Sequence, residues 1–158
     1  MDNNLNTGIL LLSHGSKLDY GKDVINSLKD MYLKEFPDAI VEVGFMEIRK
    51  PDIPQAVETL KSRGNLDKII VVPVFVAHGL HTKRDIPKIL GLEAVEEIEE
   101  DHSHHHHHDH GHSHHHHHEV ETIDFDGEIV YADPLGADPL ILEIIKNRIS
   151  TALDINFD

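Results

Sequence analysis

Three histidines stand apart from the histidine-rich tract of this sequence, and each follows an apolar run. His14 comes after residues 8–13, and His78 and His81 come after residues 68–76. A lone histidine in such a place is usually a hydrogen-bonded loop residue, but three in two loops favour a shared site. Neutral imidazole binds Co²⁺, Ni²⁺ and Zn²⁺. Two protein ligands would leave several coordination positions open, as a site that gives its metal away requires.

Other reactive patterns near these histidines are incomplete. Ser16 lies close to His14, but the G-x-S-x-G turn of a serine hydrolase is absent. Gly15 and Gly79 permit a close approach of the backbone to a ligand, although plain turn geometry explains them equally well. Neither glycine belongs to a G-x-G-x-x-G or Walker sequence, so nucleotide binding has no support.

Several cations accompany the histidines. Lysine and arginine occur in or near the same loops, at Lys17, Arg49, Lys50, Lys83 and Arg84. On an acidic chain this clustering favours an anionic ligand, with ordinary solvated charges as the alternative.

One segment of the chain differs sharply from the rest in composition. Residues 93–128 contain 12 of the 29 acidic residues, none of the 14 basic ones and 13 of the 16 histidines. The net charge of −15 disfavours nucleic acid as a partner. Residues 93–123 lack the apolar side chains of a packed core, so we expect a disordered insert. Its imidazoles bind divalent metals, and three roles are open: a local reservoir, a buffer against metal toxicity, or a dispensable tract.

Strand and helix patterns alternate along the remaining sequence. Continuous apolar runs predict strands at 8–13, 39–46, 68–76 and 128–132. Spacing and proline starts predict helices at 19–36, 51–64, about 82–90 and 138–153. The third strand should lie centrally, with a bulge or irregular end at Pro73. We therefore predict one α/β domain over residues 1–158, with about four parallel strands and helices on both faces of the sheet.

Two of the predicted helices carry apolar stripes. In the helix at 19–36, the spacing places four apolar residues broadly on one side: Val24, Leu28, Met31 and Phe36. In the last helix, four isoleucines should form a buried stripe: Ile141, Ile144, Ile145 and Ile149.

The predicted sheet also locates a ligand site. In open parallel sheets, ligands bind outside the carboxyl ends of the strands. This rule selects the loops at 14–16, 47–50, 77–81 and 134–136. Neighbouring strands lie about 4.8 Å apart, so histidines after the first and third strands can face one pocket.

The sequence also excludes several classes of protein. It contains no cysteine, which rules out a disulfide scaffold, a thiolate zinc site and a cysteine nucleophile. The first residues show no signal-peptide pattern, and no apolar run approaches the roughly 20 residues of a membrane span. We therefore expect a cytoplasmic protein without a membrane partner.

Three motifs of this chain resemble those of a known enzyme family. LLSHGS at 11–16, VVPVFVAHGLHTKRDIP at 71–87 and DPLGADP at 133–139 are similar to those of the small class II chelatases, the archaeal sirohydrochlorin cobaltochelatases and nickelochelatases. The resemblance runs from about residue 8 to 153 and includes the histidine-rich insert. It implies a chelatase-like three-layer sandwich and a homodimer, and larger relatives look like two fused copies of this unit.

The resemblance also implies roles for particular residues. Metal would be bound by His14 and His81. The tetrapyrrole would lie along Val76, Ala77, His78, Gly79, Leu80 and His81, with Lys50 also near it. A glutamate matching Glu47 is common in the family and could help with protons or metal.

The resemblance predicts a lyase that inserts a divalent metal into sirohydrochlorin, with His14 as the chief base. Cobalt would lead toward cobalamin, and nickel toward the nickel tetrapyrrole of methane-forming archaea; iron insertion is a further alternative. The histidine-rich insert favours nickel mildly. No tightly bound cofactor is expected, because the metal is a substrate. The alternative from another class is a nickel or cobalt metallochaperone or storage protein.

Overall fold

The structure, a computed structural model, describes residues 6–92 and 121–155. The insert predicted at 93–123 therefore lies outside the described residues, except for its last three. Of these, Ile123 packs against the hydrophobic core, and its N–H donates to the carbonyl of Ile89 at 2.9 Å. The insert thus ends before Ile123.

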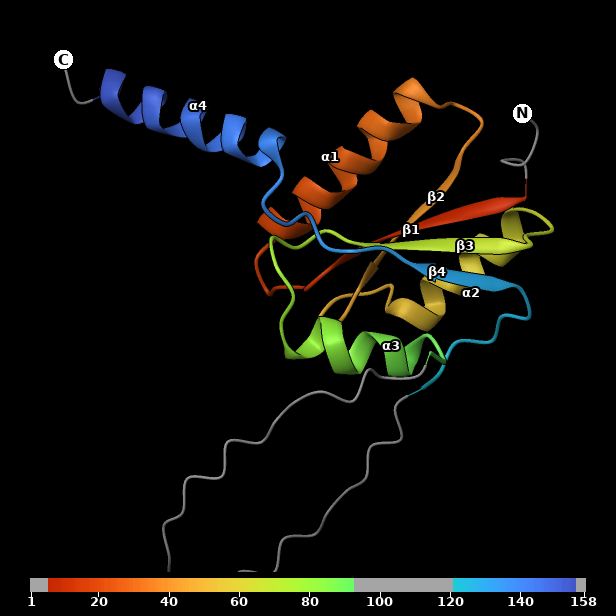
Figure 1. Cartoon of the computed structure of the whole chain (residues 1–158). Helices are drawn as coiled ribbons and strands as arrows, with labels where there is room; N and C mark the ends of the chain where they lie inside the picture. The colour runs from red at the N-terminus through yellow and green to blue at the C-terminus, as the bar shows by residue number, and fades with distance from the viewer. Residues whose placement is uncertain (1–5, 93–120, 156–158) are drawn as a thin grey trace, which may run out of the picture.

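The strands form one parallel sheet in the order β2-β1-β3-β4 (Figure 1). They are β1 (Thr7–Ser13), β2 (Ile40–Phe45), β3 (Lys68–Pro73) and β4 (Glu128–Tyr131). The central position predicted for β3 is confirmed, and β1 lies beside it. β3 ends at Pro73, three residues earlier than predicted, because proline has no N–H for the ladder.

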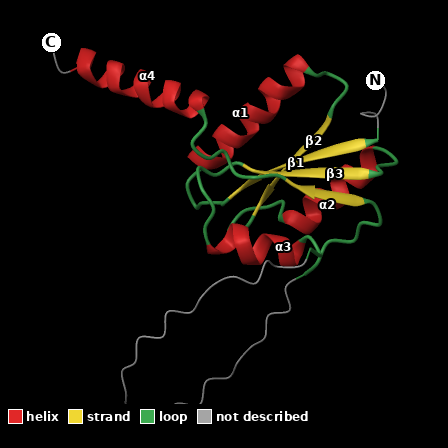
Figure 2. Cartoon of the chain, viewed as in Figure 1, coloured by secondary structure: helices red, strands yellow, loops and turns green. Residues whose placement is uncertain are grey.

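Helices lie on both faces of the sheet, which confirms the predicted α/β class (Figure 2). α1 (Tyr20–Glu35) covers one face. α2 (Ile53–Arg63) and α3 (Ile86–Ile89), the latter preceded by the π-helical turn η1 (His81–Asp85), cover the other. The main core lies between the sheet, α2 and α3, and includes Leu10, Leu12, Val57, Leu60, Ile69, Val71 and Ile86.

The stripe predicted on the last helix is not buried. α4 (Pro139–Ile155) projects from the body of the molecule (Figure 1). Ile144, Ile145 and Ile149 are about half exposed, and Ile141 alone is partly covered. Helical spacing identifies an apolar side but not the surface that covers it, so this prediction was wrong for the single chain.

The apolar side predicted for the first helix also faces outward. Val24, Leu28, Met31 and Phe36 are exposed, whereas the buried residue of α1 is Ile25. Within the described residues, no helix is both long and apolar enough to cross a membrane.

Candidate functional site

The four loops predicted to hold the site follow the carboxyl ends of the parallel strands and so share one edge of the sheet. Backbone hydrogen bonds join them in pairs. The N–H of Glu47 donates to the carbonyl of His14 at 3.2 Å, linking the loops after β1 and β2. The N–H groups of Leu135 and Gly136 donate to Phe75 and Val76, both at 2.8 Å, linking the loops after β3 and β4.

His14 is exposed at this edge, and its orientation is set by an aromatic neighbour. Its imidazole stacks on the ring of Phe75, which is almost completely buried. Gly15 has a φ of 91°, and a Cβ there would lie 1.9 Å from the carbonyl oxygen of Glu47. Gly15 is therefore required by the crossing of the two loops, which holds His14 in place.

The loop after β2 is strained and braced. Ile48 has a φ of 68°, a conformation that β-branched residues rarely adopt. The side chain of Arg49 braces the neighbouring loop: it donates to the carbonyls of Ser16 and Lys17, and to the carboxylate of Asp19 at 2.6 Å. The clustering of Arg49 with four lysine and arginine residues predicts an anionic ligand, but Nε and Nη2 of Arg49 make these three contacts within the protein.

Lysines surround a shallow depression next to these two loops. The depression has a volume of about 450 Å³ and is lined by Ser16, Lys17, Lys22, Ile48, Arg49 and Lys50. The Lys50 ammonium contacts the Asp52 carboxylate at 2.9 Å. Within the described part of the chain, neither Lys17 nor Lys22 is paired with a carboxylate. The depression therefore offers positive charge to an anionic ligand.

Asp52 also caps helix α2. Its carboxylate accepts a hydrogen bond from the N–H of Gln55, whose side chain accepts one from the N–H of Asp52. Burial opposes ionisation of this carboxyl, but the N–H of Gln55 and the charge of Lys50 outweigh it and keep the pKa of Asp52 below its usual value.

The loop after β3 presents an apolar ledge, which we define as residues 76–80. Val76 and Leu80 expose 66% and 47% of their surface, and His78 is exposed between them. A Cβ added to Gly79 would meet no atom within 4 Å. Because Gly79 has an ordinary φ, nothing in the chain itself requires glycine at this position.

A buried threonine supports the ledge from below. The Thr82 hydroxyl accepts from the N–H of Gly79 at 2.7 Å and donates to its carbonyl at 2.9 Å. Nδ1 of His78 lies 3.2 Å from the same hydroxyl. The hydroxyl of Tyr131 donates to the Thr82 carbonyl at 2.9 Å, and burial raises the pKa of Tyr131 to about 12.

The structure brings most of the predicted site residues to the same edge of the sheet. His14, Glu47, Lys50 and the ledge residues 76–80 all lie in loops of one sheet edge. His81 begins η1 in the adjoining turn, and its side chain lies outside what the structure describes. Among the described residues, no group of three or more histidine or carboxylate side chains could hold a metal ion.

Sequence reasoning missed three supporting residues: Phe75, Thr82 and Tyr131. Phe75 could have been noticed as the aromatic residue that directly precedes the ledge. Tyr131 carried no signal, because its contact with Thr82 joins segments 49 residues apart in the sequence. Thr82 lies three and four residues after Gly79 and His78, which its hydroxyl contacts, but residue spacing alone does not show this support.

Comparisons with known proteins agree on one family. The CbiX family model matches residues 8–152. A sirohydrochlorin cobaltochelatase of Methanothermobacter thermautotrophicus is 53% identical over 157 residues, covering 97% of this chain and all of that protein. Another, from Methanopyrus kandleri, is 53% identical over 92% of this chain and 96% of its own length. The crystal structure of a CbiX protein from Marinobacter aquaeolei shares the fold, with a TM-score of 0.63 at 22% identity over 96% of this chain and 98% of that one.

Proposed function

The chain belongs to the CbiX family, and we propose that it is a metal chelatase that inserts a divalent metal into sirohydrochlorin, with Co²⁺ as the main metal. Two relatives that match nearly its whole length are sirohydrochlorin cobaltochelatases. The observation that carries the proposal is the placement of an exposed imidazole, His14, at the same sheet edge as the apolar ledge. The imidazole can bind a metal ion and accept a proton, and the apolar ledge can contact the face of a flat macrocycle.

The ledge is the proposed binding surface for the tetrapyrrole. Val76 and Leu80 offer exposed apolar contacts, and the open space at Gly79 lets a flat ring approach the backbone. Ala77, His78 and His81 complete the predicted contact set. The substrate carboxylates would be met by lysines of the neighbouring depression, with Lys50 as the predicted contact.

The chemistry requires a base as well as a metal ligand. Insertion removes two pyrrole N–H protons from the ring and water from the metal ion, and it leaves a neutral metal–nitrogen core. We assign the chief base and first metal ligand to His14, and the second ligand to His81. Neutral imidazole serves both roles near pH 7. The backbone N–H of Glu47 donates to the carbonyl of His14, so the two residues lie in joined loops, and we assign the Glu47 carboxylate to receive or relay protons.

Two finer parts of the proposal concern the metal and the insert. We include Ni²⁺ as a second metal, toward the nickel tetrapyrrole of methane-forming archaea, because imidazole binds it at least as tightly as Co²⁺. We assign the histidine-rich insert the role of raising the local metal concentration. This assignment rests on composition, since residues 93–120 lie outside the described structure.

The remaining parts of the proposal are a homodimer, a cytoplasmic location and no tightly bound cofactor. The alternative function is a nickel or cobalt metallochaperone or storage protein, which the 13 histidines of the insert favour. Such a protein would bind metal but not accelerate its insertion.

The central experiment is anaerobic insertion, followed by absorbance, with sirohydrochlorin and separately Co²⁺, Ni²⁺ or Fe²⁺. We expect acceleration over protein-free controls. Single-turnover rates should fall at least tenfold in His14→Ala and His81→Ala, but not in the matched control His110→Ala within the insert. Near-normal rates in both site variants would refute the residue assignment. Tight metal binding without any acceleration would support the chaperone alternative.

A second experiment tests the insert. Deletion of residues 102–118 should slow insertion only when metal is scarce, because the proposed role is to concentrate metal and not to perform chemistry. Loss of activity at saturating metal would show that the insert takes part in catalysis.

A further inference from the structure

Metal insertion releases two pyrrole protons, but His14 can accept only one of them. A neutral imidazole has a single nitrogen lone pair. While His14 holds the metal, that lone pair is occupied, and it becomes free for a proton only when the metal has passed to the ring. Glu47 lies in the loop that a backbone hydrogen bond joins to His14, so its carboxylate can serve the same proton. The second proton therefore requires an acceptor elsewhere along the ring.

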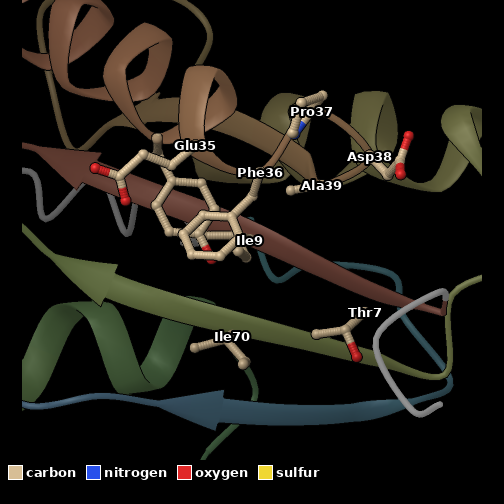
Figure 3. Close-up of a pocket in the computed structure, with 9 residues that line it drawn as sticks. Thr7, Ile9, Glu35, Phe36, Pro37, Asp38, Ala39 and Ile70 are labelled. Atoms are coloured by element: carbon tan, nitrogen blue, oxygen red, sulfur yellow. The ribbon is translucent and has the colours of Figure 1, made fainter. Parts of the chain in front are cut away.

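A hollow at the other end of the sheet does not provide this acceptor. The hollow, of about 520 Å³, lies between Ile9 and Ile70 of the strands and Phe36 after α1 (Figure 3). Thr7, which begins β1, also lines it, whereas His14 follows the end of β1. No histidine is among the described residues that line the hollow. A second base next to the ring must therefore come from the loops that follow the strands.

His78 is a second histidine at this edge of the sheet, and the buried Thr82 holds its ring. Nδ1 of His78 lies 3.2 Å from the Thr82 hydroxyl. That hydroxyl donates its one hydrogen to the carbonyl of Gly79, and one of its two lone pairs accepts from the N–H of Gly79. Only the other lone pair is left for His78. Nδ1 of His78 must therefore carry a hydrogen and donate it to Thr82.

This hydrogen bond decides which nitrogen of His78 is basic. In a neutral imidazole one nitrogen is a donor and the other is an acceptor. With the hydrogen on Nδ1, the free lone pair lies on Nε2. Thr82 is 2% exposed, whereas the side chain of His78 is 33% exposed. The imidazole thus extends from a buried hydroxyl to the surface of the ledge, where Nε2 can meet a pyrrole N–H.

A carboxylate lies opposite Nε2 of His78. Oδ1 of Asp133 is 3.7 Å from this nitrogen, which is too far for a hydrogen bond but close enough to attract a positive charge. The backbone on both sides of Asp133 is anchored, because the N–H groups of Ala132 and Leu135 donate to carbonyls of β3 and of the loop after it. In water such an exposed pair contributes little, but a bound macrocycle that excludes water would strengthen it.

We infer that His78 is a second catalytic base, whose Nε2 accepts one of the two pyrrole protons while Thr82 and Asp133 orient it. This role rests on the proposed chelatase function and on the ledge as the surface that binds the ring. In the step, a pyrrole N–H bond breaks, its electron pair stays on the pyrrole nitrogen and binds the metal, and a new N–H bond forms at Nε2. The imidazolium returns its proton to water before the next turnover.

Single-turnover insertion of Co²⁺ into sirohydrochlorin by the full chain tests the base. His78→Asn keeps an N–H donor for the Thr82 hydroxyl but has no basic nitrogen. Its rate should fall roughly 100-fold, the lower end of what a positioned general base contributes. The Kd for sirohydrochlorin should stay unchanged, and the loss should persist at saturating Co²⁺. Circular dichroism checks that the variant is folded.

A double-variant comparison tests the positioning role of Asp133. Asp133→Asn should slow insertion roughly fivefold, as expected for the loss of one charge pair. In the His78→Asn background the same change should have no further effect, because no imidazolium forms there. The matched control is Asp38→Asn, which removes an equal charge at the distant hollow and should leave the rate unchanged (Figure 3).

Four results would overturn the role of His78 and leave the chelatase proposal standing. They are a wild-type rate in His78→Asn, a rise in Kd that accounts for its whole loss, a loss that disappears at saturating Co²⁺, and an equal effect of Asp133→Asn in both backgrounds. The third result would make His78 a metal ligand instead of a base. A wild type that does not accelerate insertion would overturn both the base and the chelatase proposal.

Discussion

The imidazole of His14 stacks on the ring of Phe75, with centroids 3.9 Å apart and ring planes inclined by 27°. One partner is exposed and the other is 6% exposed, so a ring anchored in the core orients a ring at the surface. The contact joins the ends of the two central strands, β1 and β3. A histidine held in this way loses little rotamer freedom when it binds a ligand, which favours a preorganised site.

The first prediction concerns this stack. Phe75→Leu should slow single-turnover metal insertion by about 2- to 10-fold, because an aromatic pair contributes about 0.5–1.5 kcal/mol. The matched control is Phe125→Leu, a partly buried phenylalanine at the other end of the sheet, which should lower stability without slowing insertion. Equal rates for the two variants would mean that Phe75 acts only through packing.

The second prediction concerns Gly79. Since a Cβ there meets nothing in the chain, Gly79→Ala should leave the free energy of unfolding unchanged or raise it by less than about 1 kcal/mol. If the ring lies against the ledge, the added methyl group should nevertheless raise the KM for sirohydrochlorin roughly tenfold, a cost of about 1.4 kcal/mol. Gly21→Ala, which also meets open space, is the control and should leave KM unchanged. An unaltered KM in Gly79→Ala would place the ring elsewhere.

The sequence was sufficient for the layout of the fold but not for its contacts. Continuous apolar runs such as 8–13 identified the strands. Of the strand order, the sequence predicted only the central position of the most apolar run, 68–76. The sheet-edge rule then located the loops of the site. The stacking of Phe75 and the bracing role of Arg49 depend on side-chain directions between distant segments, which residue spacing does not encode. Whether the apolar side of α4 is buried depends on how the helix is placed relative to other surfaces, which its own residue spacing does not encode.

The third prediction concerns Arg49, which joins the loops after β1 and β2 through Ser16, Lys17 and Asp19. Arg49→Ala should lower the free energy of unfolding by about 1–3 kcal/mol and also raise the KM for sirohydrochlorin, because the loop that carries His14 loses its brace. Arg63→Ala removes another arginine–carboxylate pair, with Glu42 on β2. It should lower stability by a similar amount while leaving KM unchanged. A KM effect of equal size in both variants would contradict the bracing role.

The last prediction concerns stability at high pH. Burial raises the pKa of Tyr131 to about 12 in the folded chain, from about 10 for an exposed tyrosine. The folded state therefore holds this proton more tightly than the unfolded state does. The resulting stability is fully present below pH 10 and is lost as the pH rises from 10 to 12.

Urea unfolding at pH 9, 10 and 11 checks this dependence. Tyr131→Phe should be less stable than the wild type at pH 9, because the hydrogen bond to the Thr82 carbonyl is gone. Its stability should then fall less steeply with pH, so that the difference between the two proteins narrows. Tyr20→Phe, at an exposed position, provides the control and should keep the wild-type slope. Parallel slopes for Tyr131→Phe and the wild type would show that this phenol titrates alike in the folded and unfolded chains. The phenol would then make no contribution to the pH dependence of the free energy of unfolding.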